Sequence, residues 1–387
     1  MRITDAHAYV VRVNKDDMDP ASKPWTFVRV DTDEGVSGWG ECTSYAGGSS
    51  FLTAQAVLAM KDALIGEDPF LIERLWQKMY RRHTYLGARG LPTAALSGVD
   101  IALWDIKGRA LGLPVHNLLG GKVRDTVPVY ANGWFGGCQT PQDYAEAARR
   151  MLVSSGHRAC KLDPFREMRP YHAAYMEGQI SAEGEQAGCD IVSAVREVVG
   201  PGHEILVDAH GHYNVPTAAR LATRLYEESR IGWFEEPVPP ESLAALRQVR
   251  EQTPAPICVG ERLYTRFDFA PVLEDGLADY VMPDVVWTGG ITELRKIAAM
   301  AEAHYVPLSP HNAHGPLQIL AGAQAGMTIP NFYRLEHSMG SIPNYNRFLA
   351  EPLDIRDGAL TLPDRPGLGI DVDLDEVLSS LHPQWDA

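Results

Sequence analysis

From about residue 127 onward the chain repeats one pattern: a short apolar stretch, a polar or glycine stop, and a stretch with helical periodicity. The repeat predicts eight strands, at residues 127–131, 158–162, 204–209, 232–234, 257–259, 280–282, 306–308 and 332–335. Helices are predicted between them, for example at 219–227 and 293–303. Eight such units over roughly 200 residues fit a closed parallel β/α barrel better than an open doubly wound sheet. No G-x-G-x-x-G follows a predicted strand and no G-x-x-x-x-G-K-S/T occurs, which disfavours nucleotide-binding α/β folds.

In the first 125 residues the predicted elements follow a different order, with strands first and helices after them. An alternating strand is followed by a second at 26–30, which turns at 33–35 into a strand around 38–40, so a β-meander is predicted. One helix is predicted to start with Asp68 as N-cap and Pro69 as its first residue, and another spans 93–111. Strands followed by helices indicate a compact α+β unit. Two loops, at 14–23 and 44–50, are long enough to act as lids or are ordinary surface loops.

The last part of the chain, from about residue 349, contains a turn-rich stretch at 358–370 that predicts a β-hairpin returning to the first unit. We therefore divide the chain into residues 1–125, 126–348 and 349–387. The fold class expected is α/β: a modified TIM (β/α)-barrel with an N-terminal α+β domain that the C-terminal segment completes.

Charge and cysteine usage narrow the function. The 35 basic and 50 acidic residues give a net charge of −15, which argues against a nucleic-acid or anionic-membrane partner and would require a local cation for an anionic substrate. The five cysteines are far apart and lack a C-x-x-C pair, which indicates a reducing compartment and disfavours a thiolate zinc site. The N-terminus lacks a signal-peptide pattern and no window resembles a membrane span, so we expect a soluble cytoplasmic protein.

Reactive side chains follow the last six predicted strands at intervals of 23 to 27 residues, about one β/α unit. They are Asp208, Glu235, Glu261, Asp284, His311 and Glu336. A single acidic residue after a strand is more often a helix N-cap or a solvated charge. Six in register predict a cluster at the C-terminal mouth of the barrel, where the catalytic groups of such barrels lie.

The predicted cluster combines a cation site with an acid–base pair. Three carboxylates (Asp208, Glu235 and Glu261) would repel one another without a cation, and hard oxygen ligands with open positions suit Mg²⁺ better than zinc or calcium. Asp284 and His311 follow the next two strands, and a carboxylate bonded to one imidazole nitrogen would make the other a base near neutral pH. His210 comes two residues after Asp208 and is expected on the same side of its strand, facing the same mouth.

Motifs along nearly the whole chain resemble the enolase superfamily, and within it the mandelate racemase-type sugar-acid dehydratases related to galactonate dehydratase. The motifs are DTDEGVSGWGE, ALSGVDIALWDIKGRALG, GGKVRD, VDAHG, WFEEP, GERLYTRFDF, MPD with GGITE, SPH, LEHSMG and PGLGI. VDAHG and GERLYTRFDF favour the dehydratase branch. A His or Lys base acting with Mg²⁺ is typical of the superfamily.

The resemblance implies a role for each matching residue. Asp208, Glu235 and Glu261 would bind Mg²⁺, with Glu236 in support. His311, paired with Asp284, would remove the proton α to the substrate carboxylate. His210 would protonate the departing 3-hydroxyl. Glu336 would hydrogen-bond the carboxylate end of the intermediate, as the protonated acid or through a shared proton. The first unit would act as a capping domain over the mouth, and a symmetric homo-oligomer is implied.

One departure from the family concerns the second barrel strand, where many relatives carry Lys-x-Lys. Here the chain reads Cys160-Lys161-Leu162-Asp163, so a second base is missing, which disfavours a racemase or epimerase. Lys161 would contact the substrate carboxylate or pair with a barrel carboxylate. Asp163 would bind a substrate hydroxyl or cap a helix before Pro164. The long polar stretch 165–184 suggests specificity or a subunit contact.

Further histidines and tryptophans leave alternatives open. His212 and His314 lie near the predicted site in sequence, whereas His304 is expected on a surface or in a satisfied core position. Trp39 and Trp104 fit core packing. Trp134 and Trp287 follow barrel strands, so each is either a pocket residue or a packing residue.

Together these features predict Mg²⁺-dependent dehydration of a linear sugar acid, such as galactonate, gluconate or arabinonate, to a 2-keto-3-deoxy acid. A lactone cycloisomerase is the nearest alternative, since it uses the same α-carbon chemistry without net loss of water. A catalytically retired sugar-acid binding protein is another, although such proteins usually lose a metal ligand or the base, and all six mouth residues are present.

Overall fold

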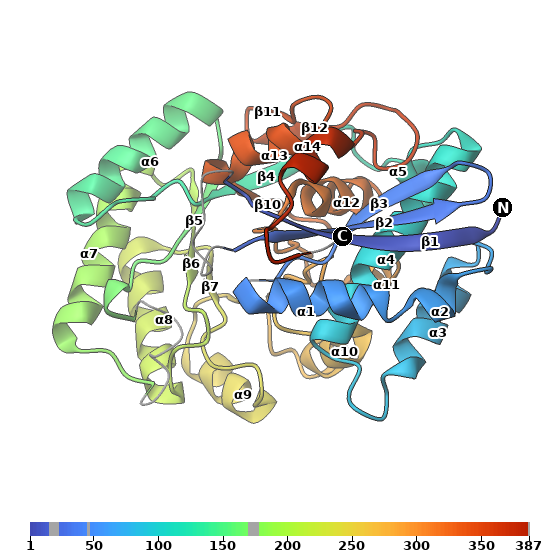
Figure 1. The fold of residues 1–387 in the computed structure, drawn as a ribbon. Helices are drawn as coiled ribbons and strands as arrows, with labels where there is room; N and C mark the ends of the chain where they lie inside the picture. The colour runs from blue at the N-terminus through green and yellow to red at the C-terminus, as the bar shows by residue number, and fades with distance from the viewer. Residues whose placement is uncertain (15–22, 45–46, 169–177, 386–387) are drawn as a thin grey trace.

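The computed structural model describes residues 1–14, 23–44, 47–168 and 178–385, which form a barrel with a smaller α+β unit beside it (Figure 1). In chain order, the first six barrel strands pair in parallel, each with the next, and the last strand pairs in parallel with the first. They are β4 (Val127–Asn132), β5 (Ala159–Leu162), β6 (Glu204–Asp208), β7 (Trp233–Glu235), β8 (Ile257–Val259), β9 (Tyr280–Val281) and β10 (Leu335–Ser338). The predicted parallel β/α barrel is confirmed.

The strand predicted at 306–308 is present only as isolated bridges. Leu308 bridges Val281 on one side and Phe332 on the other, which closes the ring between β9 and β10. Pro307 and Pro310 flank this segment, and a proline has no N–H to donate, so a continuous ladder cannot form. The last strand also begins three residues later than predicted, at Leu335.

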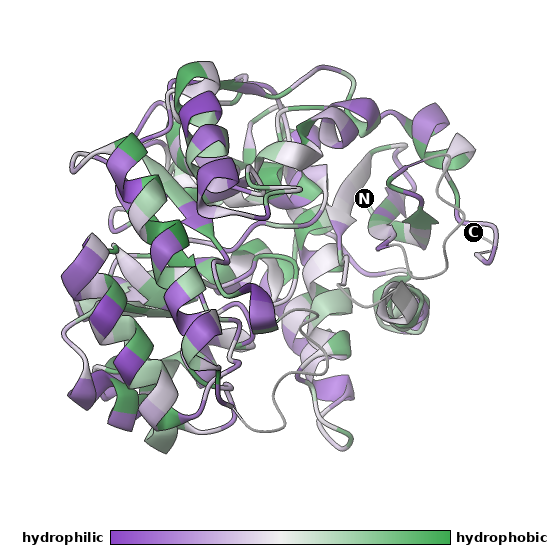
Figure 2. Cartoon of the chain, turned by 90° about the vertical axis from the view of Figure 1, so that its left-hand side faces the viewer, coloured by the Kyte–Doolittle hydropathy of each residue, from purple (hydrophilic) through white to green (hydrophobic). Residues whose placement is uncertain are grey.

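Helices cover the outside of the barrel, and most carry hydrophilic and hydrophobic residues in alternating bands (Figure 2), whereas every residue of the last one, 316–326, is buried. They are α6 (Pro141–Ser155), α7 (Ala182–Val199), α8 (Val215–Ser229), α9 (Leu243–Gln252), α10 (Thr265–Glu274), α11 (Gly290–Ala303) and α12 (Pro316–Gly326). Four begin at a polar side chain that accepts a hydrogen bond from the first turn: Thr140, Ser181, Asn214 and Ser242. The helices α11 and α12 begin instead at Gly289 and Gly315, which have no capping side chain.

The α+β unit is an antiparallel meander of β1 (Ile3–Val11), β2 (Trp25–Thr32) and β3 (Ser37–Glu41), as predicted. Its helices are α1 (Gly47–Leu58), α2 (Lys61–Leu64), α3 (Ile72–Arg82) and α4 (Leu91–Leu111), with the short α5 (Val115–Leu118) after them. The sheet and α4 approach so closely that a Cβ on Gly40 would lie 2.0 Å from the carbonyl oxygen of Gly98. Glycine is therefore required at this crossing.

The predicted start of α3 is wrong. Asp68 accepts a hydrogen bond from the backbone N–H of Phe70, but the helix begins at Ile72 after Leu71, whose side chain makes no capping bond. The short Asp68-Pro69-Phe70 turn satisfies the carboxylate locally, so it does not act as a helix cap.

After β10 the chain forms η3 (Met339–Ser341) and α13 (Ile342–Phe348). The C-terminal segment then contains a hairpin of β11 (Asp354–Arg356) and β12 (Ala359–Thr361), followed by α14 (Leu374–Ser379). The hairpin lies slightly earlier than predicted and pairs with β4 of the barrel. The rest of the predicted stretch does return to the first unit, since Gly367 bridges Pro114 and the backbone N–H of Leu368 donates to Asp105. The residues after this stretch also reach that unit, since Leu381 bridges Val11 and the Trp385 indole donates to the carbonyl of Ala8. The boundaries 1–125, 126–348 and 349–387 stay a prediction.

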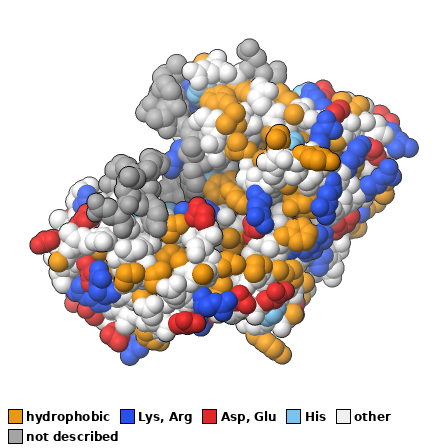
Figure 3. All heavy atoms as spheres, turned by 90° about the horizontal axis from the view of Figure 1, so that it is seen from below, with side chains coloured by type: hydrophobic (Ala, Val, Ile, Leu, Met, Phe, Trp, Pro, Cys, Tyr) orange, Lys and Arg blue, Asp and Glu red, His pale blue; other side chains and the backbone are white. Residues whose placement is uncertain are grey.

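The predicted loops at 14–23, 44–50 and 165–184 fall in part outside the described residues. Where described, residues 47–50 belong to α1 and 166–168 form the 3₁₀ turn η1 (Arg166–Met168). Among the helices that the structure describes, none is both long and apolar enough to cross a bilayer. Seen from below, basic side chains lie among acidic ones, so the acidic excess forms no single patch on that face (Figure 3).

Candidate active site at the barrel mouth

Three carboxylates from successive strand ends meet at the mouth, as the sequence spacing predicts. Asp208 and Glu235 are register partners at the ends of β6 and β7, and Glu261 follows β8. One carboxylate oxygen of each lies within 4.8 Å of the others, and all three side chains are buried. This arrangement offers three oxygen ligands on one side of a cation.

Lys161, at the end of β5, lies among these carboxylates. Its Nζ is 2.6 Å from Oε1 of Glu235, 3.1 Å from Oδ2 of Asp208 and 3.0 Å from Oε1 of Glu336. Burial would lower the pKa of Lys161, but the surrounding carboxylates, Glu235 first, raise it well above its ordinary value. The ion pair with a barrel carboxylate, one of the two roles considered for this residue, is therefore formed.

One ammonium group does not balance the acidic cluster. Burial and the charge of Asp208 raise the pKa of Glu235 well above its ordinary value, so its charged form is disfavoured in the absence of a further cation. A divalent ion between the carboxylates would remove the repulsion and let each one ionise. The donor set therefore fits a hard divalent cation.

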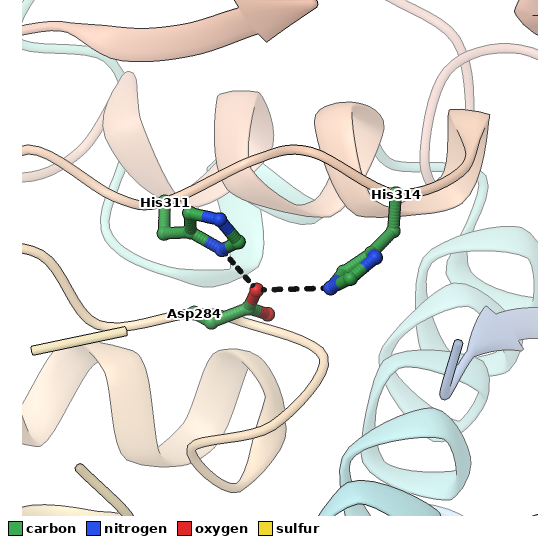
Figure 4. Close-up of side chains that lie close together, drawn as sticks. All are labelled: Asp284, His311 and His314. Carbon is green, nitrogen blue, oxygen red and sulfur yellow. Dashed lines mark hydrogen bonds and ion pairs between the residues drawn. The ribbon is translucent and has the colours of Figure 1, made fainter. Parts of the chain in front are cut away.

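His311 and Asp284 form the predicted pair. Nδ1 of His311 lies 2.6 Å from Oδ2 of Asp284, and the two residues are also bridged in parallel register. His314 approaches the same oxygen from the other side, at 3.6 Å (Figure 4). Because Asp284 occupies Nδ1, the other ring nitrogen of His311 faces the cluster, 3.4 Å from Oε2 of Glu261. Burial would lower the pKa of His311, but Glu261, Glu336 and Asp284 raise it to about 9.

His210 lies beside another carboxylate of the trio, Asp208. Its Nδ1 is 3.2 Å from Oδ1 of Asp208 and 3.5 Å from Oδ1 of Asp163. The strand β6 ends at Asp208, so strand alternation does not place this imidazole. Instead His210 has a left-handed backbone, with φ of 48°, and its N–H bonds to Asp208. Such strained conformations in non-glycine residues cluster at functional sites.

Glu336 is surrounded by donors. The side-chain amide of Asn132 and the backbone N–H of Asn312 bond to its two oxygens, at 2.7 and 3.0 Å, in addition to Lys161. Burial would raise the pKa of Glu336, but Lys161 and His311 lower it below its ordinary value. Its donors therefore favour the ionised form here, and the predicted role of Glu336 toward the intermediate, as the protonated acid or through a shared proton, stays a prediction.

Glu236 does not join the three carboxylates as a ligand and pairs with Arg262. Arg262 also lies 3.6 Å from Oε1 of Glu261, so it links the loops after β7 and β8. Sequence reasoning gave Arg262 no role, although its place directly after Glu261 could have suggested one.

A pocket of about 640 Å³ lies over this mouth, between the barrel and the α+β unit. From the barrel it is lined by Asp163, His210, His212, Glu261, Arg262, Tyr264 and Trp287, and from the α+β unit by Lys23, Ser44, Thr53, Gly90, Leu91 and Ala94. A pocket with carboxylate, imidazole and guanidinium groups on one wall suits a small polar ligand.

The remaining histidines and tryptophans separate into pocket and packing residues. Trp287 lines the pocket and stacks on His311, with ring centroids 5.7 Å apart. Trp134 packs against Phe135 and Tyr144 and donates to the carbonyl of Lys161. The core packing predicted for Trp39 is confirmed, and Trp104 is half-buried and donates to Thr292. The predicted surface position of His304 is confirmed too.

Two buried residues near the pair had no signal in the sequence. Gln318 donates to Oδ2 of Asp284 at 2.8 Å and to the backbone carbonyl of His311 at 3.2 Å. Glu41, at the end of β3, accepts hydrogen bonds from the start of α12. Both act across elements that are distant in sequence, and neither lies in a motif that specifies such a contact.

Known proteins resemble the chain over its whole length. Residues 18–120 match the family described as mandelate racemase/muconate lactonizing enzyme, N-terminal domain, and residues 143–377 match the enolase C-terminal domain-like family. A D-galactonate dehydratase of Variovorax paradoxus (strain S110) is 38% identical, with 100% of this chain and 96% of the relative covered. A D-galactarolactone cycloisomerase of Agrobacterium fabrum is 36% identical, with 92% and 91% covered.

Solved structures agree with the sequence matches. The crystal structure of a mandelate racemase/muconate lactonizing enzyme-like protein from Rubrobacter xylanophilus superposes with a TM-score of 0.87 at 35% identity, covering 99% of this chain and 98% of the other. The likeness includes both the barrel and the α+β unit. The chain belongs to the mandelate racemase/muconate lactonizing enzyme family of the enolase superfamily.

Proposed function

We propose that the chain is a Mg²⁺-dependent sugar-acid dehydratase that converts a linear aldonate, such as galactonate, gluconate or arabinonate, into a 2-keto-3-deoxy acid. The observation that carries the proposal is the placement of two imidazoles against different members of the carboxylate trio: His210 beside Asp208 and His311 beside Glu261. An α,β-elimination needs a base and an acid in this relation. The relative named D-galactonate dehydratase supports the substrate class.

Asp208, Glu235 and Glu261 would hold the divalent ion, which members of the enolase superfamily bind. We propose Mg²⁺ because the donors are all carboxylate oxygens, with one side left for water and substrate. When bound, the ion would stabilise the negative charge that develops on the substrate carboxylate, an effect worth several kcal/mol. It would also offset the chain's charge of −15 for an anionic substrate.

His311 is the base in this proposal. Its Nδ1–H donates to Asp284, which leaves Nε2 to accept the proton from the substrate α-carbon. Part of the pKa increase at His311 comes from Glu261. A cation held by Glu261 would reduce that contribution and bring the pKa of His311 closer to neutrality, where a base is most effective.

His210 is the acid. The electrons of the C2–H bond that His311 breaks first move into the substrate carboxylate, which gives an enediolate. They then form the C2–C3 double bond as the C3–O bond breaks, and His210 gives its proton to the leaving hydroxyl, which departs as water. The resulting enol tautomerises to the 2-keto acid. Burial would lower the pKa of His210, but Asp208 and Asp163 raise it, which favours the protonated form required of an acid.

Three further residues would bind the substrate. Lys161 and Glu336 lie next to the carboxylates and would contact the substrate's carboxylate end. Asp163 lines the pocket beside His210 and would bind a substrate hydroxyl. The capping domain would cover the substrate, since its residues form the other wall of the pocket. A cytoplasmic location and a symmetric homo-oligomer belong to the same proposal.

A lactone cycloisomerase is the second possibility, and the relative named D-galactarolactone cycloisomerase favours it. That reaction would also use a base beside the α-carbon, but it would give an isomer and no net loss of water. The product therefore separates the two functions.

The deciding experiment incubates the purified protein and Mg²⁺ with a library of acid sugars and their lactones. We expect a 2-keto-3-deoxy acid from at least one aldonate, detected by a keto-specific reagent and by mass spectrometry as a loss of 18 Da, the mass of water. Isomerisation of a lactone without that loss would support the cycloisomerase. Binding without turnover of any acid would overturn both and leave a retired binding protein.

A further inference from the structure

Glu41 connects the capping domain to the barrel. It ends β3 of the capping sheet, but its carboxylate is completely buried at the start of α12 in the barrel. Its Oε1 accepts the backbone N–H of Gly315 at 2.6 Å, and its Oε2 accepts those of Leu317 and Gln318 at 3.1 and 3.0 Å. The hydroxyl of Thr43 donates a fourth bond, at 2.6 Å.

The carboxylate of Glu41 takes the place of a capping side chain for α12. That helix begins at Gly315 and Pro316, so its own sequence provides no side-chain acceptor for the free N–H groups of the first turn. A carboxyl group at a helix N-terminus is stabilised by these donors and, when it is ionised, also by the helix dipole. The approach requires glycine, because a Cβ at Gly315 would lie 2.6 Å from Oε1 of Glu41.

From α12 the contact continues to the Asp284–His311 pair. Gln318, whose backbone N–H is bound by Glu41, donates through its side chain to Asp284 and to the carbonyl of His311. Its side-chain oxygen accepts the backbone N–H of His314 at 2.8 Å. One glutamine therefore fixes the carboxylate of Asp284 and both ends of the segment from His311 to His314.

A second carboxylate of the capping domain acts in the same way on the neighbouring helix. Asp100 of α4 is buried and accepts the backbone N–H of Thr292, in the first turn of α11. That helix also begins at a glycine without a capping side chain, and a Cβ at Gly290 would lie 2.2 Å from Oδ2 of Asp100. The helices α11 and α12 are the ones that directly follow Asp284 and His311.

We propose that Glu41 is a positioning residue that holds the Asp284–His311 pair in its reactive arrangement, through the first turn of α12 and the side chain of Gln318. Docking of the capping domain would thereby be required for an aligned base, and not only for covering the substrate. The kinetic consequence rests on the proposed function of His311, whereas the structural consequence does not.

The primary variant is Glu41→Gln in the full-length, Mg²⁺-loaded protein. It keeps the side-chain size but replaces one acceptor oxygen with an amide that faces backbone N–H groups. We expect kcat to fall by up to about 100-fold, the loss typical of a misplaced reacting group, while KM changes little. Gln318→Leu should have a similar effect. The kcat of the double variant should be no lower than that of the more impaired single variant, because both residues act on one path.

Asp105→Asn is the matched control. Asp105 is also a buried carboxylate of the capping domain, but among the described residues its hydrogen bonds come from Trp39, Leu368 and Arg109 and not from α11 or α12. It should lower the melting temperature and leave kcat unchanged. If Asp105→Asn lowers kcat as much as Glu41→Gln at equal loss of melting temperature, Glu41 serves stability alone and the proposal fails.

A readout independent of turnover separates this proposal from the function. In the Mg²⁺-loaded protein, Glu41→Gln should speed hydrogen exchange at Gly315, Leu317 and Gln318 and shift the Nδ1–H proton resonance of His311. Both changes are expected even if no acid sugar is turned over, in which case only the proposed function falls. If Glu41→Gln does not fold, Gly315→Ala is used, since its Cβ should displace the Glu41 carboxylate with the same results. Unchanged exchange and an unchanged His311 resonance in a folded variant would overturn the proposal.

Discussion

The Nζ of Lys161 lies 2.6 Å from Oε1 of Glu235, inside a group of carboxylates that are all buried. Lys161 is the positive charge in direct contact with Asp208, Glu235 and Glu336. Its ammonium group thus stabilises the acidic cluster whether or not a cation is bound. The stability of the metal-free protein should depend strongly on it.

Lys161→Gln should destabilise the metal-free protein by about 3–5 kcal/mol, because it leaves buried carboxylates without their partner. Mg²⁺ should restore more stability to this variant than to the wild type, since the ion compensates the same charges. Denaturant unfolding in EDTA and in Mg²⁺ measures both effects. The control is Lys296→Gln, which breaks a partly exposed pair with Glu73 and should cost less than about 1 kcal/mol. Equal effects of the two substitutions would contradict the prediction.

Removal of metal should abolish activity. EDTA should eliminate formation of the 2-keto acid and Mg²⁺ should restore it, because Asp208, Glu235 and Glu261 are the proposed ligands. Asp208→Asn or Glu261→Gln should weaken Mg²⁺ binding by at least about tenfold, as measured by calorimetry. Full activity in EDTA would contradict the metal dependence, and unchanged affinity in both variants would contradict the assignment of these ligands.

His311→Asn should stop exchange of the substrate α-hydrogen with solvent deuterium while Mg²⁺ binding persists, because the variant lacks the nitrogen that accepts the proton. NMR of the substrate in D₂O follows the exchange directly. His304→Asn provides the control, since His304 is exposed at the end of α11. Exchange that continues in His311→Asn would exclude this residue as the base.

His210→Asn should separate the two halves of the reaction. The variant keeps the base, so we expect α-hydrogen exchange to continue while formation of the 2-keto acid falls by about 100-fold or more. The same D₂O experiment measures both rates in one sample. Loss of exchange together with dehydration would instead place His210 in proton abstraction or in substrate binding.

The barrel was predictable because its signal is local and repeated. Each apolar strand ends in a polar residue such as Asp208 or Glu235, and parallel strands bring these ends to the same edge. The break at 306–308 was readable in principle from Pro307 and Pro310. The start of α3 was not, because Asp68 satisfies its hydrogen bond within a short turn that propensities do not distinguish from a cap.

The contacts that surround the site depend on long-range packing. The hydrogen bond between Glu41 and Gly315 joins residues 274 positions apart, and no sequence pattern around either residue predicts the contact. The lowered pKa of Glu336 follows from Lys161 and His311, which come from other parts of the barrel. The clustering of Asp208, Glu235 and Glu261 could be predicted from strand register. The position of His210 could not, because it depends on a left-handed backbone that the sequence does not specify.

The pH dependence of stability should carry a contribution from Glu41. Burial raises its pKa to about 7, and hydrogen bonds from Thr43, Gly315 and Gln318 offset this only in part, while the charge of Asp284 adds to it. The folded protein therefore holds a proton that the unfolded chain has lost above its ordinary pKa of about 4.3. The stabilisation from that proton is full below this pH and is lost as the pH rises through about 7.

Glu41→Gln removes this titration. The wild type should therefore lose stability relative to the variant as the pH rises, so the free energy of unfolding of the variant minus that of the wild type should increase. The increase should reach about 3 kcal/mol between about pH 5 and pH 8, from the size of the pKa shift. Urea unfolding of both proteins across this range measures the difference, in which the contributions of other titrating groups largely cancel. A difference that stays constant, or that moves in favour of the wild type with rising pH, would show that Glu41 is already ionised at pH 5. The donors of α12 would then outweigh burial in setting its pKa.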